Sequence, residues 1–343
     1  MKKNLLFNQY DKDTLLVQVL KDPRERSVLS FYRYVKFSNP VQFRDFLYEK
    51  LFSIGVLGRI YLANEGINAQ LSVPTEEYQN LRDFIDSIPE LSNVYFNDAI
   101  EDKKESFLKL KIKVRKKIVA DGLNDDQFDP SNVGTHLTPL EFHKHLDDPE
   151  TIVVDLRNNY ESEVGHFENA ICPDVGTFRE ELPIVENMLS DKKDQKILLY
   201  CTGGIRCEKA SAYLKYKGFK DIYQLQGGII SYAKAIKDHG LPSKFKGKNF
   251  VFDDRLGEKI TDDVLTVCYQ CGNPSDRQTN CSNLGCHVLF VQCESCRDTF
   301  DNCCSERCHS IIQLSEEEQR KLRKDGLRHT YETHHLTRKI VGK

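Results

Sequence analysis

Residues 197–207 read ILLYCTGGIRC, an apolar run typical of a strand that passes directly into a glycine-containing loop. The segment that follows, 208–217, favours a helix. Open α/β sheets show this order of strand, short loop and helix, and they bind ligands beyond the carboxyl ends of their strands. Cys201 stands at such a strand end, so we expect it in a functional site.

The residue types of this loop favour an ionised sulfur. Gly203 and Gly204 allow the backbone to turn back, so that successive N–H groups converge on Cys201. The positive end of the following helix and the charge of Arg206 stabilise the thiolate and lower the thiol pKa from about 8.5. The loop is thus a predicted anion cradle around a nucleophile. Its lining residues are Thr202, Gly203, Gly204 and Ile205.

Cys207 follows the loop arginine in the predicted first turn of the helix. It could resolve a sulfenic acid or persulfide on Cys201, or it could be a small core residue. The candidate catalytic residues are therefore Cys201, Arg206 and Cys207.

The pattern around this loop predicts several domains. Short buried strands at 151–156, 196–200 and 221–225 alternate with helical stretches, which is typical of a parallel α/β sheet covered on both faces. We assign this domain to residues 131–242. Asp155, Arg157 and His166 lie within it, and we expect them to brace the fold through buried polar contacts.

The residues before this domain predict an α+β unit. Strands at 28–34, 59–62, 67–73 and 107–119, with helices at 41–54 and 75–87, follow the order βαββαβ of a ferredoxin-like fold. We assign it to residues 1–130. A polar, acidic stretch rich in turn residues, 121–137, reads as a linker.

The overall composition excludes some classes of protein. The 343 residues contain 49 Lys and Arg against 52 Asp and Glu, a net charge of −3, so binding to nucleic acid must be local. The apolar runs fall short of the roughly 18–20 residues of a membrane helix. The start of the chain does not resemble a signal peptide, and we expect a cytoplasmic protein.

Twelve cysteines stand out, and nine of them lie between Cys268 and Cys308 in a third region, 243–343. Their short spacings suit tetrahedral thiolate sites, and two such sites need eight ligands. Reduced or disulfide-linked cysteines without metal are the alternative. Zinc is favoured over iron. The candidate ligands are Cys268, Cys271, Cys281, Cys286, Cys293, Cys296, Cys303 and Cys308.

The pairing of these cysteines stays open in the sequence. A cross-braced arrangement joins 268/271 with 293/296, and 281/286 with Cys308 and either Cys303 or Cys304. A sequential arrangement is equally allowed.

One predicted strand carries cations on a single face. In the segment LKLKIKVR, 108–115, alternation separates the apolar residues from the basic ones. This face could follow an RNA backbone, aided by a basic tail from Arg320, or it could simply be solvated. The basic residues are Lys109, Lys111, Lys113 and Arg115.

Residues 138–240 resemble the rhodanese family. The resemblance rests on Val154-Asp155-Leu156-Arg157, Glu161, Gly165-His166-Phe167, the Cys201 loop and Gly227-Gly228. It implies a loop cysteine able to hold sulfur as a persulfide. A related phosphatase branch places five residues between Cys and Arg, whereas this chain has four, which favours sulfur chemistry.

A narrower resemblance covers nearly the whole chain. The Cys201 loop with its flanks, the segments ANEGIN (63–68) and FVFDDR (250–255), and the cysteine-rich region resemble the oxygen-dependent tRNA uridine hydroxylases. This implies conversion of wobble uridine 34 to 5-hydroxyuridine, with molecular oxygen as co-substrate and the tRNA anticodon loop as partner.

The chain shows no nucleotide, flavin or haem fingerprint. We therefore expect addition of Cys201 to C6 of the uridine, which makes C5 reactive toward oxygen, with a sulfur donor or reductant protein as a further partner. The alternative is a rhodanese-type sulfurtransferase or sulfur carrier for tRNA thiolation.

Overall fold

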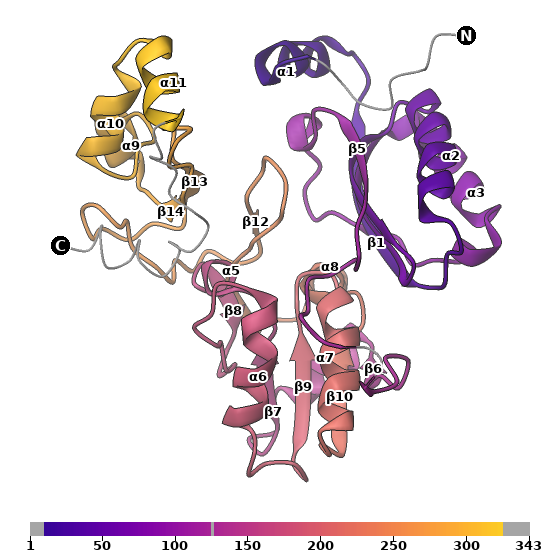
Figure 1. Ribbon diagram of the computed structural model, residues 1–343. Helices are drawn as coiled ribbons and strands as arrows, with labels where there is room; N and C mark the ends of the chain where they lie inside the picture. The colour runs from indigo at the N-terminus through magenta and orange to yellow at the C-terminus, as the bar shows by residue number, and fades with distance from the viewer. Residues whose placement is uncertain (1–9, 125–126, 325–343) are drawn as a thin grey trace.

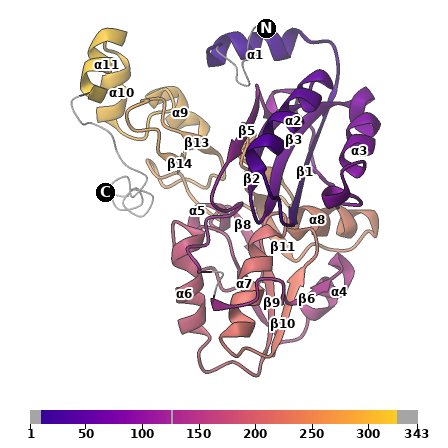
Figure 2. The same ribbon diagram turned by 45° about the vertical axis from the view of Figure 1, so that its right-hand side comes forward.

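The computed structural model describes residues 10–124 and 127–324 and arranges them in three regions along the chain (Figure 1). The N-terminal domain lies over the end of the central parallel sheet, and the cysteine-rich region extends to one side (Figures 1 and 2). None of the helices in the described ranges is long and apolar enough to cross a membrane.

The N-terminal domain is a five-stranded sheet in the order β4-β1-β3-β2-β5. The helices α2 (Pro40–Ser53) and α3 (Tyr78–Asp86) pack on one face, because Leu47, Leu51, Leu81 and other apolar residues share a core with the sheet. Within the described residues, no helix of this domain packs on the opposite face. The strands are β1 (Arg26–Tyr34), β2 (Leu57–Ala63), β3 (Gly66–Pro74), β4 (Asn97–Asp98) and β5 (Leu110–Val114).

The ferredoxin-like order is present, but its last strand differs from the prediction. The closing strand of the βαββαβ unit is β4, which has only two residues and pairs with β1. The strand expected at 107–119 is the shorter β5, which pairs in parallel with β2 at the other edge. The sequence also gave no sign of helix α1 (Lys12–Lys21), and a 3-10 turn, Thr75–Glu77, precedes α3.

The central domain is a parallel sheet in the order β6-β10-β9-β7. Helices α6 and α7 pack on one face, and α4 and α8 pack on the other, each pair with its own apolar core. The strands are β6 (Thr135–Leu137), β7 (Ile152–Asp155), β9 (Lys196–Tyr200) and β10 (Asp221–Leu225). The helices are α4 (Pro139–His145), α5 (Asn159–Ser162), α6 (Phe178–Met188), α7 (Ile205–Tyr216) and α8 (Gly228–Asp238).

Two strands differ from the organisation expected from the sequence. β6 occupies the end of the predicted linker and pairs with β10. β11 (Phe245–Asn249), from the third region, pairs with β8 (Gly165–Phe167) of the central domain. The remaining elements are β12 (Glu258–Lys259), β13 (Gln278–Asn280), β14 (Leu289–Val291), α9 (Glu294–Phe300), α10 (Glu306–Ile312) and α11 (Glu316–Lys324). Most of the basic tail, 325–343, lies outside the described residues.

Buried polar contacts join the N-terminal and central domains. The Asn97 side chain donates a 2.7 Å hydrogen bond to the carbonyl of Gly227 and accepts one of 3.1 Å from Ser231. Lys209 of α7, almost fully buried, forms a 2.8 Å ion pair with Glu65 in the β2–β3 turn. Both contacts involve segments next to the Cys201 loop, so the docking of the domains also positions that loop.

We expect Asn97→Ala to lower the free energy of unfolding by about 1–3 kcal/mol, because the Gly227 carbonyl and the Ser231 hydroxyl lose a buried partner. Urea unfolding measures the effect. Asn80→Ala is the control: Asn80 is exposed and its side chain bonds only to nearby Glu77, so the change should stay within about 0.5 kcal/mol. Equal unfolding midpoints for the two variants would contradict the role of Asn97.

Candidate active site at the Cys201 loop

Cys201 directly follows strand β9, and its loop leads into helix α7. The Gly204 N–H donates a 3.1 Å hydrogen bond to the Cys201 sulfur, which is the contact expected of an anion cradle. Gly204 has φ +102°, and a Cβ there would lie 2.8 Å from the Tyr32 hydroxyl oxygen. This position therefore requires glycine both for its backbone conformation and for the close approach of the N-terminal domain.

The Cys201 thiol is acidic although it is buried. Burial raises its pKa, but a hydrogen bond from Cys207, the Arg206 charge and the N–H groups of Arg206 and Gly204 outweigh that effect. The result is a pKa of about 6, so the thiolate predominates at neutral pH. Cys207 is itself fully buried, and burial followed by the contact with Cys201 raises its pKa. Cys207 is thus a thiol donor to a Cys201 thiolate.

Arg206, whose charge lowers the pKa of Cys201, is itself held in an ion pair with Glu161. Its guanidinium donates two hydrogen bonds, of 2.7 and 2.8 Å, to the carboxylate of Glu161, which is inaccessible to solvent. Thr202 donates to the same carboxylate at 3.4 Å. Glu161 therefore fixes the arginine and the loop, and Arg206 supplies charge to the sulfur rather than a free site for substrate.

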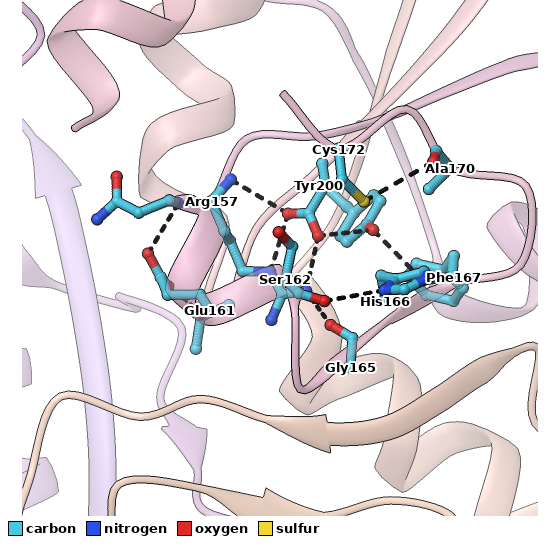
Figure 3. Close-up of polar contacts among 12 residues, drawn as sticks. Arg157, Glu161, Ser162, Gly165, His166, Phe167, Ala170, Cys172 and Tyr200 are labelled. Carbon is cyan, nitrogen blue, oxygen red and sulfur yellow. Dashed lines mark hydrogen bonds and ion pairs between the residues drawn. The ribbon is translucent and has the colours of Figure 1, made fainter. Parts of the chain in front are cut away.

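A second network of polar contacts, mostly buried, surrounds the end of strand β9 (Figure 3). Arg157 binds the carboxylate of Asp155 and donates to the Gly165 carbonyl at 2.6 Å. Tyr200, the residue before Cys201, donates to Asp155 at 2.8 Å, and His166 bonds the carbonyl of Ser162. These residues hold the strand ends in place, in line with the bracing role expected for Asp155, Arg157 and His166.

Cys201 lines a cavity of about 500 Å³ between the domains. The helix-free face of the N-terminal sheet forms one wall, the Cys201 loop forms another, and Phe252 and Arg255 of the FVFDDR segment also contribute. The loop residues Thr202, Gly203, Ile205 and Arg206 line it too, whereas Gly204 only shapes the loop. The cavity is therefore a candidate substrate pocket with Cys201 in its wall.

The polar residues of the segment ANEGIN (63–68) have different contacts. Asn68 lines the cavity, while Asn64 donates to the Phe37 carbonyl and Glu65 accepts from the Ile118 N–H. Only Asn68 of this segment is placed to meet a substrate in the cavity.

The structure shows the predicted alternation of basic and apolar residues in the segment 109–115. Lys109, Lys111 and Arg115 are exposed and Lys113 is half-buried, while Leu110 and Ile112 between them are buried. None of the four cations lines the cavity itself. The sequence did not single out Arg59, Tyr61 and Gln70, which do line it. The alternation of apolar and polar residues in strands 57–63 and 66–74 could have indicated that these polar side chains share one face of the sheet.

The cysteine-rich region gathers eight thiols into two groups in the cross-braced pattern. Within each group the sulfur atoms lie within 4.8 Å of one another. The groups are Cys268, Cys271, Cys293, Cys296 and Cys281, Cys286, Cys304, Cys308.

The second group contains Cys304 where the predicted ligand set named Cys303. Cys304 and Cys308 are four residues apart at the start of α10, and their sulfurs lie 3.7 Å apart. Cys303 is fully buried outside the group, where its carbonyl accepts from Gln270 and Gln292. The turn that leads into α10 therefore determines that Cys304, and not Cys303, joins the group.

Comparison with family models finds three consecutive matches. Residues 26–118 match the UPF0176 acylphosphatase like domain, residues 138–235 match the rhodanese-like domain, and residues 246–309 match the rhodanase C-terminal model.

Curated relatives align over most of the chain. A tRNA uridine(34) hydroxylase of Leptospira interrogans is 54% identical over 326 residues, which cover 95% of this chain and 89% of the relative. Relatives of the same name from Photorhabdus laumondii and Yersinia pestis are 49% and 50% identical over 320 residues. Those alignments cover 93% of this chain and 91% and 90% of the relatives.

The Cys207 hydrogen bond can be tested by alkylation. We expect iodoacetamide to label Cys201 with a midpoint near pH 6, measured by peptide mass spectrometry across a pH series. Cys207→Ala should move the midpoint upward, because the thiolate loses a donor, whereas Cys207→Ser keeps a donor and should stay closer to the parent. An unchanged midpoint in Cys207→Ala would show that Cys207 does not activate Cys201.

Proposed function

This chain belongs to the tRNA uridine(34) hydroxylase family, and from that premise we propose how its residues carry out the reaction. Its activity is the hydroxylation of the wobble uridine of tRNA, an oxidoreductase reaction. The observation that carries the mechanism is the acidic Cys201 thiol in the wall of a cavity between the domains. We propose that uridine 34 of the anticodon loop enters this cavity as an unpaired base.

The first step uses Cys201 as the nucleophile. Its thiolate adds to C6 of the uracil ring, and the negative charge passes to C5 and the adjacent carbonyl. The Gly204 N–H and the Arg206 charge lower the pKa of Cys201, which keeps the sulfur ionised at neutral pH. A thiolate of low pKa also leaves readily, so the same groups assist its release at the end of the reaction.

The oxidation then balances with molecular oxygen and two electrons. C5 bonds to one oxygen atom of O₂, and two electrons with two protons release the other oxygen atom as water. Loss of the C5 proton and departure of the Cys201 thiolate from C6 restore the ring double bond and give 5-hydroxyuridine. The two electrons come from a thiol or persulfide reductant, and a sulfur donor or reductant protein is its source. We propose that Cys207, which hydrogen-bonds to Cys201, resolves an oxidised or persulfide form of that residue.

The basic residues of β5 and of the positions on either side of it support binding of the tRNA backbone. Lys109, Lys111, Lys113 and Arg115 form this face, whereas the neighbouring Lys117 pairs with Asp121 at 2.7 Å. A tRNA substrate favours a cytoplasmic location.

The two cysteine groups support binding of two structural zinc ions. Tetrahedral zinc with bonds of about 2.3 Å to sulfur separates its ligand sulfurs by about 3.8 Å. The sulfur distances Cys271–Cys293 and Cys286–Cys304 are 3.6 and 3.7 Å, so the thiols fit this ion. Bound there, zinc would cross-link loops of the third region and take no part in the oxidation.

We expect Cys201→Ser to abolish 5-hydroxyuridine in tRNA, because an alcohol of high pKa does not add to C6. Nucleoside analysis of tRNA from complemented deletion cells measures the product. Cys172→Ser is the matched control, since Cys172 lies outside the cavity lining and burial raises its pKa to about 12.

The same experiment separates hydroxylation from sulfur transfer, for which a persulfide on Cys201 would also suit the loop. The two products have the same nominal mass change, so chromatography and retardation on thiol-binding mercury gels are needed. Loss of a thiolated nucleoside in the deletion strain, with 5-hydroxyuridine intact, would overturn hydroxylation in favour of the sulfurtransferase.

We expect the purified protein to contain two zinc ions per chain, one for each cysteine group. Cys304→Ser should lose one of them, while Cys303→Ser should keep both, because only Cys304 stands among the gathered thiols. Metal analysis by mass spectrometry measures the ratio. A protein without zinc or iron would contradict the metal sites.

A further inference from the structure

The strand register of the N-terminal sheet creates two continuous rows of side chains on its helix-free face. Each row follows paired residues from strand to strand toward the edge strand β5. The first row is Asn97, Ser30, Gln70, Arg59 and Lys111. The second row is Tyr32, Asn68, Tyr61 and Lys113. We call them together the polar rows.

The polar rows lead from the Cys201 loop to the basic edge. At one end the Tyr32 hydroxyl donates to Glu208 of α7 at 3.0 Å, and Asn97 bonds to Gly227. At the other end stand Lys111 and Lys113 on β5. All the residues between line the cavity that contains Cys201, including Arg59 and Tyr61. Four strand spacings of about 4.8 Å make the first row about 19 Å long, which exceeds the size of a single base.

The basic end of the polar rows is electrostatically unfavourable in the free protein. Arg59 and Lys111 lie directly beside each other on neighbouring strands, an arrangement in which like charges repel. Burial lowers the pKa of Lys113, and the positive charges of Lys111, Arg115 and Arg59 lower it further. Among the residues that the structure describes, no carboxylate forms an ion pair with Arg59, Lys111 or Lys113. An anion is the group that would relieve this repulsion.

An aromatic ring stands beside these cations, because Tyr61 shares strand β2 with Arg59 and pairs with Lys113. Tyr61 is half-buried, lines the cavity, and has the Arg115 guanidinium 5.9 Å from its ring centroid. A ring with charged neighbours on a sheet surface suits stacking of a nucleobase whose phosphate lies on the cations.

We propose that the polar rows bind the nucleotide next to uridine 34, with its phosphate on Arg59, Lys111 and Lys113 and its base stacked on Tyr61. This inference rests on the proposed function, because it takes the uridine in the cavity as given. Arg59 is the connecting residue, since it both lines the cavity and stands beside Lys111. The rows thus hold the anticodon loop in the orientation that brings the target base to Cys201.

Single substitutions test the phosphate site by tRNA binding at several salt concentrations. We expect Arg59→Ala, Lys111→Ala and Lys113→Ala each to weaken binding of an anticodon stem-loop RNA about tenfold. Each should also reduce the slope of log K against log[salt] by about 1. Lys50→Ala is the matched control, because Lys50 is exposed on α2, on the other face of the same sheet. It should change neither quantity.

Tyr61 is tested separately. Tyr61→Leu should weaken binding about tenfold through loss of stacking, while Tyr61→Phe keeps the ring and should bind like the parent. For all these variants the Cys201 alkylation midpoint should remain near pH 6, which shows that the loop is intact. In turnover the loss should appear mainly in KM for tRNA rather than in kcat.

The outcomes separate this inference from the proposed function. If the parent enzyme forms 5-hydroxyuridine and the Arg59, Lys111 and Lys113 variants bind RNA with the same affinity and salt slope as Lys50→Ala, the polar rows are only a solvated face. If the parent forms no 5-hydroxyuridine but the variants still lose RNA affinity, the proposed reaction fails and the binding surface stands. Equal binding by Tyr61→Leu and Tyr61→Phe would remove the stacking role.

Discussion

The ionised sulfur of Cys201 is the constraint on which the site depends. A buried thiolate is unfavourable unless nearby groups stabilise its charge, and here burial alone would raise the thiol pKa. The stabilising groups are the Gly204 N–H, the charge of Arg206 and the thiol of Cys207. Each depends on a further contact, since Glu161 fixes Arg206 and the left-handed conformation of Gly204 aims its N–H. The conformation of the loop is therefore tied to the charge of the sulfur.

The same loop organises the contacts between domains. Tyr32 approaches Gly204 and bonds to Glu208, and Asn97 bonds to Gly227 at the start of α8. On the other side, Arg255 of the third region binds Asp253 and Glu258 and donates to the carbonyl of Glu101. The N-terminal sheet forms one wall beside this loop, so Cys201 faces a cavity of about 500 Å³ between the domains.

The sequence predicted those parts of the fold and site that have a local cause. Strands β7, β9 and β10 are short apolar runs, and the Cys201 loop has its glycines and arginine within a few residues. The two-residue strand β4 and the linker strand β6 were missed, because their pairing depends on β1 and β10 rather than on a pattern of their own. The choice of Cys304 over Cys303 depends on where helix α10 begins, which adjacent identical residues cannot reveal.

By itself the sequence indicated the chemistry that we propose: a cysteine before a glycine loop and an arginine, a basic strand and paired thiols are properties of residue types at short spacing. Only the tertiary structure decided what surrounds that chemistry. Arg206 could have met a substrate, but the fold pairs it with Glu161, forty-five residues away. No local sequence motif identified Arg59 and Tyr61. The strand register nevertheless places them in the wall of the cavity that contains Cys201. The reason is that ion pairs and cavity walls are formed by residues distant in the chain, whose positions depend on the packing of whole domains.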